Sequence, residues 1–283
     1  MAPQRRTVGG SGELGVYGLR LSNIESGRRM LSPASASWPH LEVKRRRGAG
    51  GTEPEWLTET GARLNLQSGG EIELERDRER VTFVLPRPVR TAELIHPLLA
   101  PVGAVMAYWL GRESFHAGGF VVGGKTWAIL GARGSGKSTT MARLALAGVP
   151  VVGDDLLVVE GRTAFAGPRA VDLRADAAAH LGVGEGLGVV GARERWRVAL
   201  DGVPSETTLA GWIFLGWGQR VEMVTVPGSE RLVRLTGGRG INLPPREPEA
   251  LLDLATLPGW ELRRPKGWSS LDDAVECLLA TVG

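Results

Sequence analysis

The chain has 283 residues, of which 42% are apolar and 23% are charged, and its net charge is +3. These values are ordinary for a soluble globular protein that is long enough for one large core or two smaller ones. The single cysteine, Cys277, excludes an internal disulfide framework and an all-cysteine metal site.

The first residues, MAPQRRTVGGSGELG, have no apolar centre of the kind that a secretory signal requires. The most apolar run, residues 94–111, contains His96, Pro97 and Pro101 and is barely long enough to span a membrane. We therefore expect a buried helix at about residues 98–110, and a cytoplasmic protein with no membrane partner.

The front part of the chain has the pattern of β structure. Residues 13–24 predict an early strand, and residues 61–86 alternate apolar and polar side chains around a Gly69-Gly70 turn, which predicts a β-meander. The basic run KRRR (44–47) favours a solvated loop. The alternative, a nucleic-acid contact, has no aromatic interleaving or binding module to support it, so we expect no nucleic-acid partner. We expect a β-rich accessory domain over residues 1–105 and a second domain over residues 106–283.

The segment after this boundary predicts a strand, a phosphate-binding loop and a helix. His116 precedes residues 117–130, in which Gly123-Gly124 predicts a hairpin turn. GARGSGKSTT (131–140) then fits the pattern G-x-x-x-x-G-K-[ST] and is followed by helical spacing up to Gly148. Because His116 stands a hairpin's length before this loop, it is placed to return beside bound phosphates.

The chemistry of such a loop is the binding of ATP and Mg²⁺. Glycines let successive backbone N–H groups point at phosphate oxygens, and the helix N-terminus adds its positive end. We expect Lys137 to reach the β- and γ-phosphates and Ser138 to bind Mg²⁺. Arg133 either lies over the triphosphate or points into solvent. The expected nucleotide-binding residues are Gly131, Arg133, Gly134, Ser135, Gly136, Lys137, Ser138 and Thr139.

Paired carboxylates follow on the next apolar stretch, as Asp154 and Asp155. Adjacent side chains of a strand point to opposite sides, so the two acids can share one site only if the strand ends or bulges there. A division of labour is then natural: one acid helps Ser138 to hold Mg²⁺, a role that we give to Asp155, and the other orients and deprotonates an attacking hydroxyl. The alternative is a pair of acids at a turn.

Further along, RERWRV (193–198) predicts a strand with Arg193, Arg195 and Arg197 on one face. Three guanidinium groups on one face repel each other unless an anion lies across them. Arg195 and Arg197 are therefore candidate catalytic residues for a transferring phosphoryl group or an acidic substrate. The alternative is an edge strand with solvated charges. The last residues, 271–282, predict an amphipathic helix that packs Cys277.

The order of His116, hairpin, glycine-rich loop, short helix, strand and Asp154-Asp155 resembles the catalytic core of HPr kinase/phosphorylase. It is more similar to the smaller HPr-kinase-like proteins, which include kinases of lasso-type ribosomal peptides. The resemblance is specific over residues 112–161, weak over 167–182 and 193–200, and absent from residues 1–90. It implies an α/β fold in which a P-loop core has a mixed sheet, as in phosphoenolpyruvate carboxykinases, beside the β-rich N-terminal region.

The resemblance also implies roles for residues. Asp154 and Asp155 would supply the base and a metal-side acid, and His116 would lie near the site. The Glu-Ile-Arg-Gly signature of HPr kinases is missing, because this chain has DLRADA there, with Asp172 and Arg174 as the substitutes. The segment that docks HPr is not evident either.

We expect an ATP- and Mg²⁺-dependent kinase that phosphorylates a serine hydroxyl of a peptide or protein. The alternatives are a P-loop small-molecule kinase or NTP hydrolase, and a non-catalytic nucleotide-sensing protein. The sequence does not specify the oligomeric state.

Overall fold

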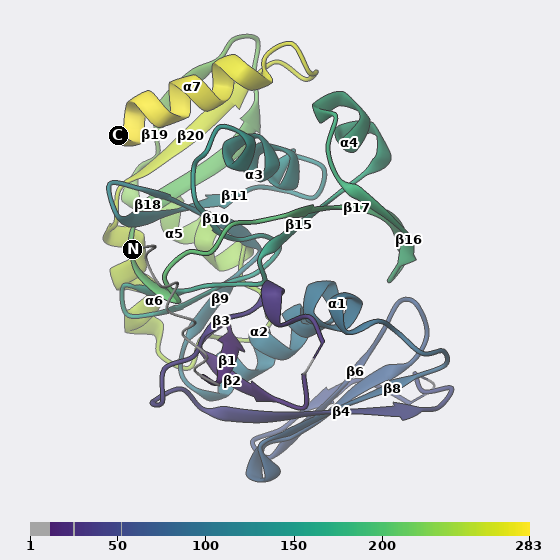
Figure 1. Cartoon of the computed structure of the whole chain (residues 1–283). Coiled ribbons are helices and arrows are strands. Elements are labelled where there is room, and N and C mark those ends of the chain that lie inside the picture. Colours follow the sequence, from purple (N-terminus) through teal and green to yellow (C-terminus); the bar gives the residue numbers. More distant parts are fainter. Residues whose placement is uncertain (1–11, 25, 52) are drawn as a thin grey trace, which may run out of the picture.

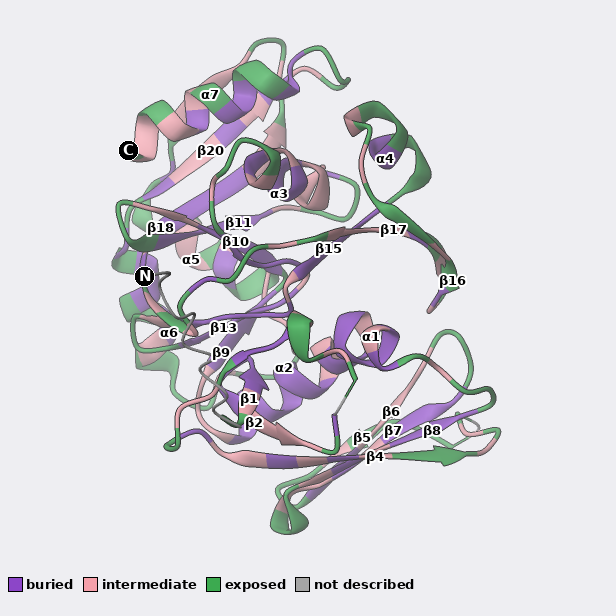
Figure 2. Ribbon diagram, viewed as in Figure 1, coloured by how far each residue is buried: buried purple, intermediate pink, exposed green. Residues whose placement is uncertain are grey.

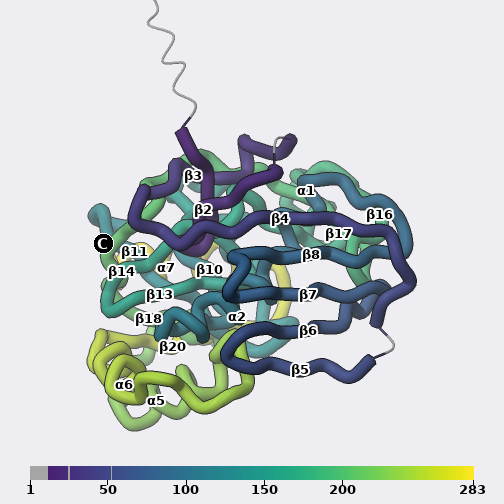
Figure 3. The backbone as a smooth tube through the Cα atoms, turned by 90° about the horizontal axis from the view of Figure 1, so that it is seen from below, coloured from purple at the N-terminus to yellow at the C-terminus, as the bar shows by residue number. Residues whose placement is uncertain are grey.

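The structure, a computed structural model, describes residues 12–24, 26–51 and 53–283. Its lower half in Figure 1 is an eight-stranded front sheet in the order β3-β1-β2-β4-β8-β7-β6-β5. Figure 3, a view from below, shows the strands β4, β8, β7, β6 and β5 lying side by side. The strands are β1 (Leu14–Val16), β2 (Leu19–Ser22), β3 (Ser32–Pro33), β4 (His40–Arg47), β5 (Trp56–Leu57), β6 (Gly61–Asn65), β7 (Glu71–Glu75) and β8 (Arg80–Leu85).

The predicted β-meander is confirmed, because β6, β7 and β8 pair antiparallel in chain order. The early strand is confirmed as a hairpin, β1 and β2, whose turn is Tyr17-Gly18. The prediction that KRRR forms a loop is wrong. These residues are the exposed end of β4, and Lys44 to Arg47 pair in parallel with Thr82 to Leu85 of β8.

A helical segment covers the front sheet and joins it to the rest of the chain. It consists of α1 (Thr91–Glu93), a π-helical stretch over Leu94–Leu98 that is kinked at His96, and α2 (Leu99–Trp109), which confirms the buried helix expected there. The expected domain boundary, between residues 105 and 106, falls inside α2. Val158 of β13, Phe165 of β14 and Leu156, which precedes β13, join α2 and the front sheet in one hydrophobic cluster. No helix among the described residues is long and apolar enough to cross a membrane.

The upper half is built on a nine-stranded mixed sheet in the order β12-β10-β11-β18-β14-β13-β9, with β20 beside β18 and β19 beside β20. The pairs β11–β18 and β18–β20 are parallel. The strands are β9 (Glu113–Phe115), β10 (Ala117–Val122), β11 (Lys125–Leu130), β12 (Val151–Gly153), β13 (Leu157–Glu160), β14 (Thr163–Phe165), β18 (Glu206–Trp217), β19 (Glu222–Thr225) and β20 (Gly259–Arg264).

Helices cover both faces of this sheet. Ile129 of β11 packs in the cluster that contains α3 (Lys137–Leu146) and α7 (Leu271–Val282). Ala128 and Leu130 alternate with it and pack in the cluster that contains α5 (Gly228–Gly237) and α6 (Pro248–Thr256). Coverage on both faces explains why these strands are almost continuously apolar. The hairpin β10–β11, the helix after the glycines and the C-terminal amphipathic helix are confirmed.

A third, three-stranded sheet extends from the core toward the right of Figure 1. Its order is β15-β17-β16, so β16 is an edge strand. Figure 2 shows that β16 and the neighbouring α4 are largely exposed. The elements are β15 (Ala170–Leu173), α4 (Ala175–Leu181), β16 (Glu185–Val190) and β17 (Arg193–Ala199), and β17 is the strand expected for RERWRV. The fold is thus mixed α/β with several mixed sheets, in agreement with the coarser part of the expectation.

Candidate functional site

Three strands bring the glycine-rich loop and the paired aspartates to one edge of the nine-stranded sheet. Hairpin strand β10 lies between β11 and β12 and is antiparallel to both, with Ala117 opposite Leu130 and Gly119 opposite Gly153. The carboxyl ends of β11 and β12 therefore meet at the same edge. Ligands of α/β sheets bind outside this end of the strands.

Residues 131–136, which we call the glycine loop, connect β11 to α3. Gly134 and Gly136 have φ values of 84° and 94°, which glycine adopts without strain. The Lys137 Nζ folds back and donates to the Gly131 carbonyl oxygen at 2.6 Å. Burial lowers the pKa of Lys137, and the charges of Asp154 and Asp155 oppose this shift. The loop thus holds a partly buried cation over the N-terminus of a helix.

The other residues expected to bind nucleotide lie along the same segment. Ser138 and Thr139 are half-buried in the first turn of α3. The Ser135 hydroxyl is buried and has no hydrogen-bond partner. Arg133 is exposed.

Asp154 is the most unusual group of the site. It is 1% exposed, and neither of its carboxylate oxygens has a hydrogen-bond partner of normal geometry. Burial, and then the charge of Asp155, raise the pKa of Asp154 to about 7, while the Ser138 hydroxyl, the Asp155 backbone and Lys137 act in the opposite direction. A buried carboxyl group without a partner is costly and rare. Its position beside Ser138 and Lys137 makes it a natural ligand for a cation that arrives with phosphate.

Asp155 lies in a different environment from its neighbour. Strand β12 ends at Gly153, and Asp155 has φ 68°, a left-handed conformation that costs a non-glycine residue of order 1–3 kcal/mol. The condition under which adjacent acids can share a site is thus met, because both stand beyond the end of the strand. The Asp155 side chain is 35% exposed, and its Oδ2 lies 3.7 Å from the Nε2 of His96.

His96, which the sequence reasoning did not select for the site, lies behind Asp155. Its side chain is fully buried, neither ring nitrogen has a hydrogen-bond partner, and Nε2 also lies 3.7 Å from Oδ2 of Asp172. Burial lowers the pKa of His96, against the opposing charges of Asp172 and Asp155. The same imidazole nitrogen therefore lies close to two carboxylates, one half-exposed and one buried.

Asp172 supplies the anion that the arginine face of β17 requires. Arg197 donates to its two carboxylate oxygens from Nε at 2.7 Å and Nη2 at 2.8 Å, and Arg195 Nη1 lies 3.5 Å away. Burial alone would raise the pKa of Asp172, but these arginines hold it below its usual value. Arg193 donates to the Asp172 carbonyl oxygen at 3.4 Å. The predicted alternation is confirmed, but the anion across it belongs to the chain itself rather than to a substrate.

Arg197 also donates to the carbonyl oxygens of Ala92, at 3.0 Å, and His96, at 2.7 Å. It thereby fixes the segment that carries His96 against β15 and β17. Arg174, named with Asp172 from the sequence, is an exposed residue that precedes α4.

His116 lies at the edge of the sheet that carries the glycine loop. It follows β9 and precedes Ala117, the partner of Leu130, and its backbone N–H donates to the Gly238 carbonyl oxygen at 2.8 Å. Its side chain is exposed. The backbone of His116 thus lies next to the strand that leads into the glycine loop. Among the described residues, its imidazole makes no hydrogen bond or ion pair with Asp154 or Asp155.

Two further residues near the site come from distant parts of the sequence. Tyr17, at the β1–β2 turn of the front sheet, is buried, and its hydroxyl has no hydrogen-bond partner. Burial raises its pKa, and the charges of Asp155 and Asp154 add to this shift. Arg264, the last residue of β20, lies against the loop, since a methyl group on Gly136 would be 2.9 Å from its Nη2. No local pattern marks either residue, because their positions depend on packing.

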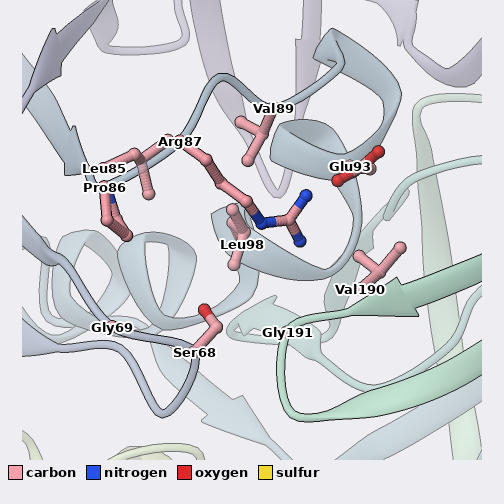
Figure 4. A pocket seen from close by; sticks show the side chains of 10 residues that line it. All are labelled: Ser68, Gly69, Leu85, Pro86, Arg87, Val89, Glu93, Leu98, Val190 and Gly191. Atoms are coloured by element: carbon pink, nitrogen blue, oxygen red, sulfur yellow. The ribbon is translucent and has the colours of Figure 1, made fainter.

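A separate hollow lies away from the glycine loop, between the front sheet and the β16–β17 turn (Figure 4). Its walls combine apolar side chains with Arg87 and Glu93. The lining residues are Ser68, Gly69, Leu85, Pro86, Arg87, Val89, Glu93, Leu98, Val190 and Gly191.

No model of a known protein family matches this chain, and no curated protein matches it either. Among solved structures, the chain is similar to one described as the Hpr(Ser) kinase/phosphatase from Coxiella burnetii. The identity is 12%, the match covers 60% of this chain and 95% of that one, and the TM-score is 0.31. A TM-score this low indicates only a distant likeness, so the function has to be inferred from the site itself.

Proposed function

We propose that this protein is an ATP- and Mg²⁺-dependent kinase that transfers the γ-phosphoryl group to a hydroxyl, that of serine in a peptide or protein. The observation that carries the proposal is Asp154. A buried carboxyl group with two unpaired oxygens stands beside Ser138 and Lys137, at the N-terminus of the helix that follows a glycine loop.

The glycine loop would hold the phosphates. The first N–H groups of a helix have no partner within it, and the helix dipole favours an anion there. Lys137 would leave the Gly131 carbonyl oxygen and pair with the β- and γ-phosphates, which would relieve the cost of its burial.

Ser138 and Asp154 would hold the metal ion. Mg²⁺ is bound in such sites by one or two protein oxygen ligands together with substrate phosphates and water, so no dedicated cage of acids is needed. A cation beside Asp154 would favour its charged form. Asp154 is buried and close to Ser138, and both features favour Asp154 as the metal ligand. We therefore assign to Asp154 the metal-binding role that the sequence analysis gave to Asp155.

Asp155 would then be the general base. Its half-exposed carboxylate can meet an incoming hydroxyl, whereas Asp154 is enclosed. His96 stands behind Asp155 and restricts where its carboxylate can lie. A base so positioned accelerates transfer typically by about 10² to 10⁴.

The third sheet supports the proposal that the acceptor is a serine in a peptide or protein. Strand β16 is an edge strand whose residues are largely exposed, and it is separated by β17 alone from β15, which carries Asp172. An extended peptide can add to such an edge through backbone hydrogen bonds. The hollow of Figure 4, at the Val190–Gly191 end of β16, would receive one of its side chains.

The test is transfer from γ-labelled ATP to a library of serine peptides in the presence of Mg²⁺, read by mass spectrometry. We expect labelled serine with the unmodified protein and none with Lys137→Ala. Asp155→Asn should still bind Mg·ATP, while its transfer rate falls by about 10² to 10⁴. Release of inorganic phosphate without any labelled acceptor would show a hydrolase instead, and an unchanged rate for Asp155→Asn would refute its role as the base.

A further inference from the structure

Arg264 is a buried cation without an acidic partner. It is 5% exposed, and its Nη1 donates to the carbonyl oxygens of Gly267, at 2.9 Å, and Pro265, at 3.4 Å. No ion pair of Arg264 occurs within the part of the chain that the structure describes. An enclosed guanidinium group whose hydrogen bonds go only to carbonyl oxygens lacks full charge compensation.

The strand order places Arg264 at the glycine loop. Strand β18 is parallel to β11, with Phe214 beside Leu130, and β20 is parallel to β18, with Arg264 beside Trp217. The three strands therefore end at the same edge of the sheet. Contact with the loop is close, because a methyl group on Gly136 would lie 2.9 Å from Nη2 of Arg264.

Trp217 forms an exposed aromatic surface at this position. The guanidinium carbon of Arg264 lies 4.7 Å from the centroid of its ring, in cation–π contact, and 43% of Trp217 is exposed. An arginine behind an indole holds the ring in place. Trp56 is exposed to a similar extent, so what sets Trp217 apart is its contact with Arg264, which also lies against Gly136 of the glycine loop.

The two sides of the glycine loop differ in chemistry. In the sheet order, β12, which leads into Asp154, lies two strands from β11 on one side, and β18 and β20 lie on the other. A nucleoside triphosphate whose γ-phosphate faces Asp154 extends its ribose and base away from that residue. Its base then lies toward the ends of β18 and β20.

From this arrangement we propose that Trp217, held by Arg264, is the platform on which the base of the nucleoside triphosphate stacks. This inference rests on the proposed binding of a nucleotide at the glycine loop. Every base has a π-face, and its stacking on an aromatic side chain contributes affinity that inorganic polyphosphate cannot obtain. The platform would thus give the protein a higher affinity for a nucleotide than for inorganic polyphosphate.

The experiment compares ATP with inorganic tripolyphosphate, both with Mg²⁺, by isothermal titration calorimetry. The unmodified protein should bind ATP more tightly than tripolyphosphate. Trp217→Ala should weaken ATP binding about 5- to 150-fold, the usual effect of losing one stacked base, and leave tripolyphosphate binding unchanged. Trp217→Phe, which keeps an aromatic ring, should retain most of the ATP affinity.

The matched control is Trp56→Ala, since Trp56 is 46% exposed on the front sheet, and neither ligand should respond to it. Equal losses for both ligands in Trp217→Ala, or no loss for either, would overturn the platform. Equal affinities of the unmodified protein for the two ligands would overturn it as well, yet would leave a phosphate site intact. Failure of the unmodified protein to bind either ligand would refute the proposed function and the platform together.

Discussion

The substitution Asp154→Asn should stabilise the folded protein at and above neutral pH, although we place Asp154 in the functional site. The carboxyl group is fully enclosed, and burial raises its pKa from 3.8 to about 7. Its charged form is therefore disfavoured in the folded state. Asparagine has nearly the same shape and never carries the charge.

The magnitude follows from proton linkage. Between pH 4 and pH 7 the folded state keeps a proton on Asp154 that the unfolded chain has released, so stability falls as the pH rises through this window and levels off above it. Each tenfold change in acidity corresponds to about 1.4 kcal/mol. The stability of Asp154→Asn relative to the unmodified protein should therefore rise by about 4 kcal/mol across the window, and more than half of this rise falls between pH 5 and pH 8.

The assay is urea unfolding of both proteins at pH 5 and pH 8, in EDTA and without nucleotide. The difference in the free energy of unfolding should grow in favour of Asp154→Asn as the pH rises. Saturating Mg·ATP should then stabilise the unmodified protein more than the variant, because a ligand that binds the folded state shifts stability with its affinity. A difference that is the same at both pH values would refute the enclosure of an unpaired carboxyl group at Asp154.

Two other substitutions test the groups behind the aspartates. Asp172→Asn should destabilise the protein by about 3–5 kcal/mol in the same assay, because it leaves Arg195 and Arg197 buried without their anion, and a loss below about 1 kcal/mol would contradict that pairing. His96→Gln should lower kcat for phosphoryl transfer about 10- to 100-fold with KM for ATP within about twofold, as expected of a residue that positions Asp155. Steady-state kinetics would separate this from a loss of the whole site, in which KM rises as well.

Local patterns in the sequence were sufficient for much of the fold. The alternation of residues 61–86, the glycine pair at 123–124 and the helical spacing after Lys137 each depend on neighbours along the chain, and the structure has the expected elements there. The run Lys44–Arg47 has the composition of a loop. It is a strand because β8, almost forty residues later, pairs with it, and no local signal reports such a partner.

Some residues of the candidate site were likewise recognisable from local sequence patterns, and others were not. The glycine loop and the two aspartates stand within 25 residues of each other and could be recognised from their order. The alternation of Arg195 and Arg197 was also evident, but their partner Asp172 is more than twenty residues away and reaches them through the pairing of β15 with β17. His96 and Tyr17 reach the aspartates only because the helical segment and the front sheet pack against the core.

A comparison of Asp154 with Asp172 indicates where a ligand is needed. Both are 1% exposed, but Asp172 has two arginine partners and Asp154 has none. At the other end of the same edge, Arg264 is a buried cation without an acid. The two opposite charges form no ion pair with each other among the described residues. A metal–nucleotide complex would bring a cation to Asp154 and anionic phosphates to the glycine loop, which Arg264 contacts at Gly136, so a single ligand would offset both charges.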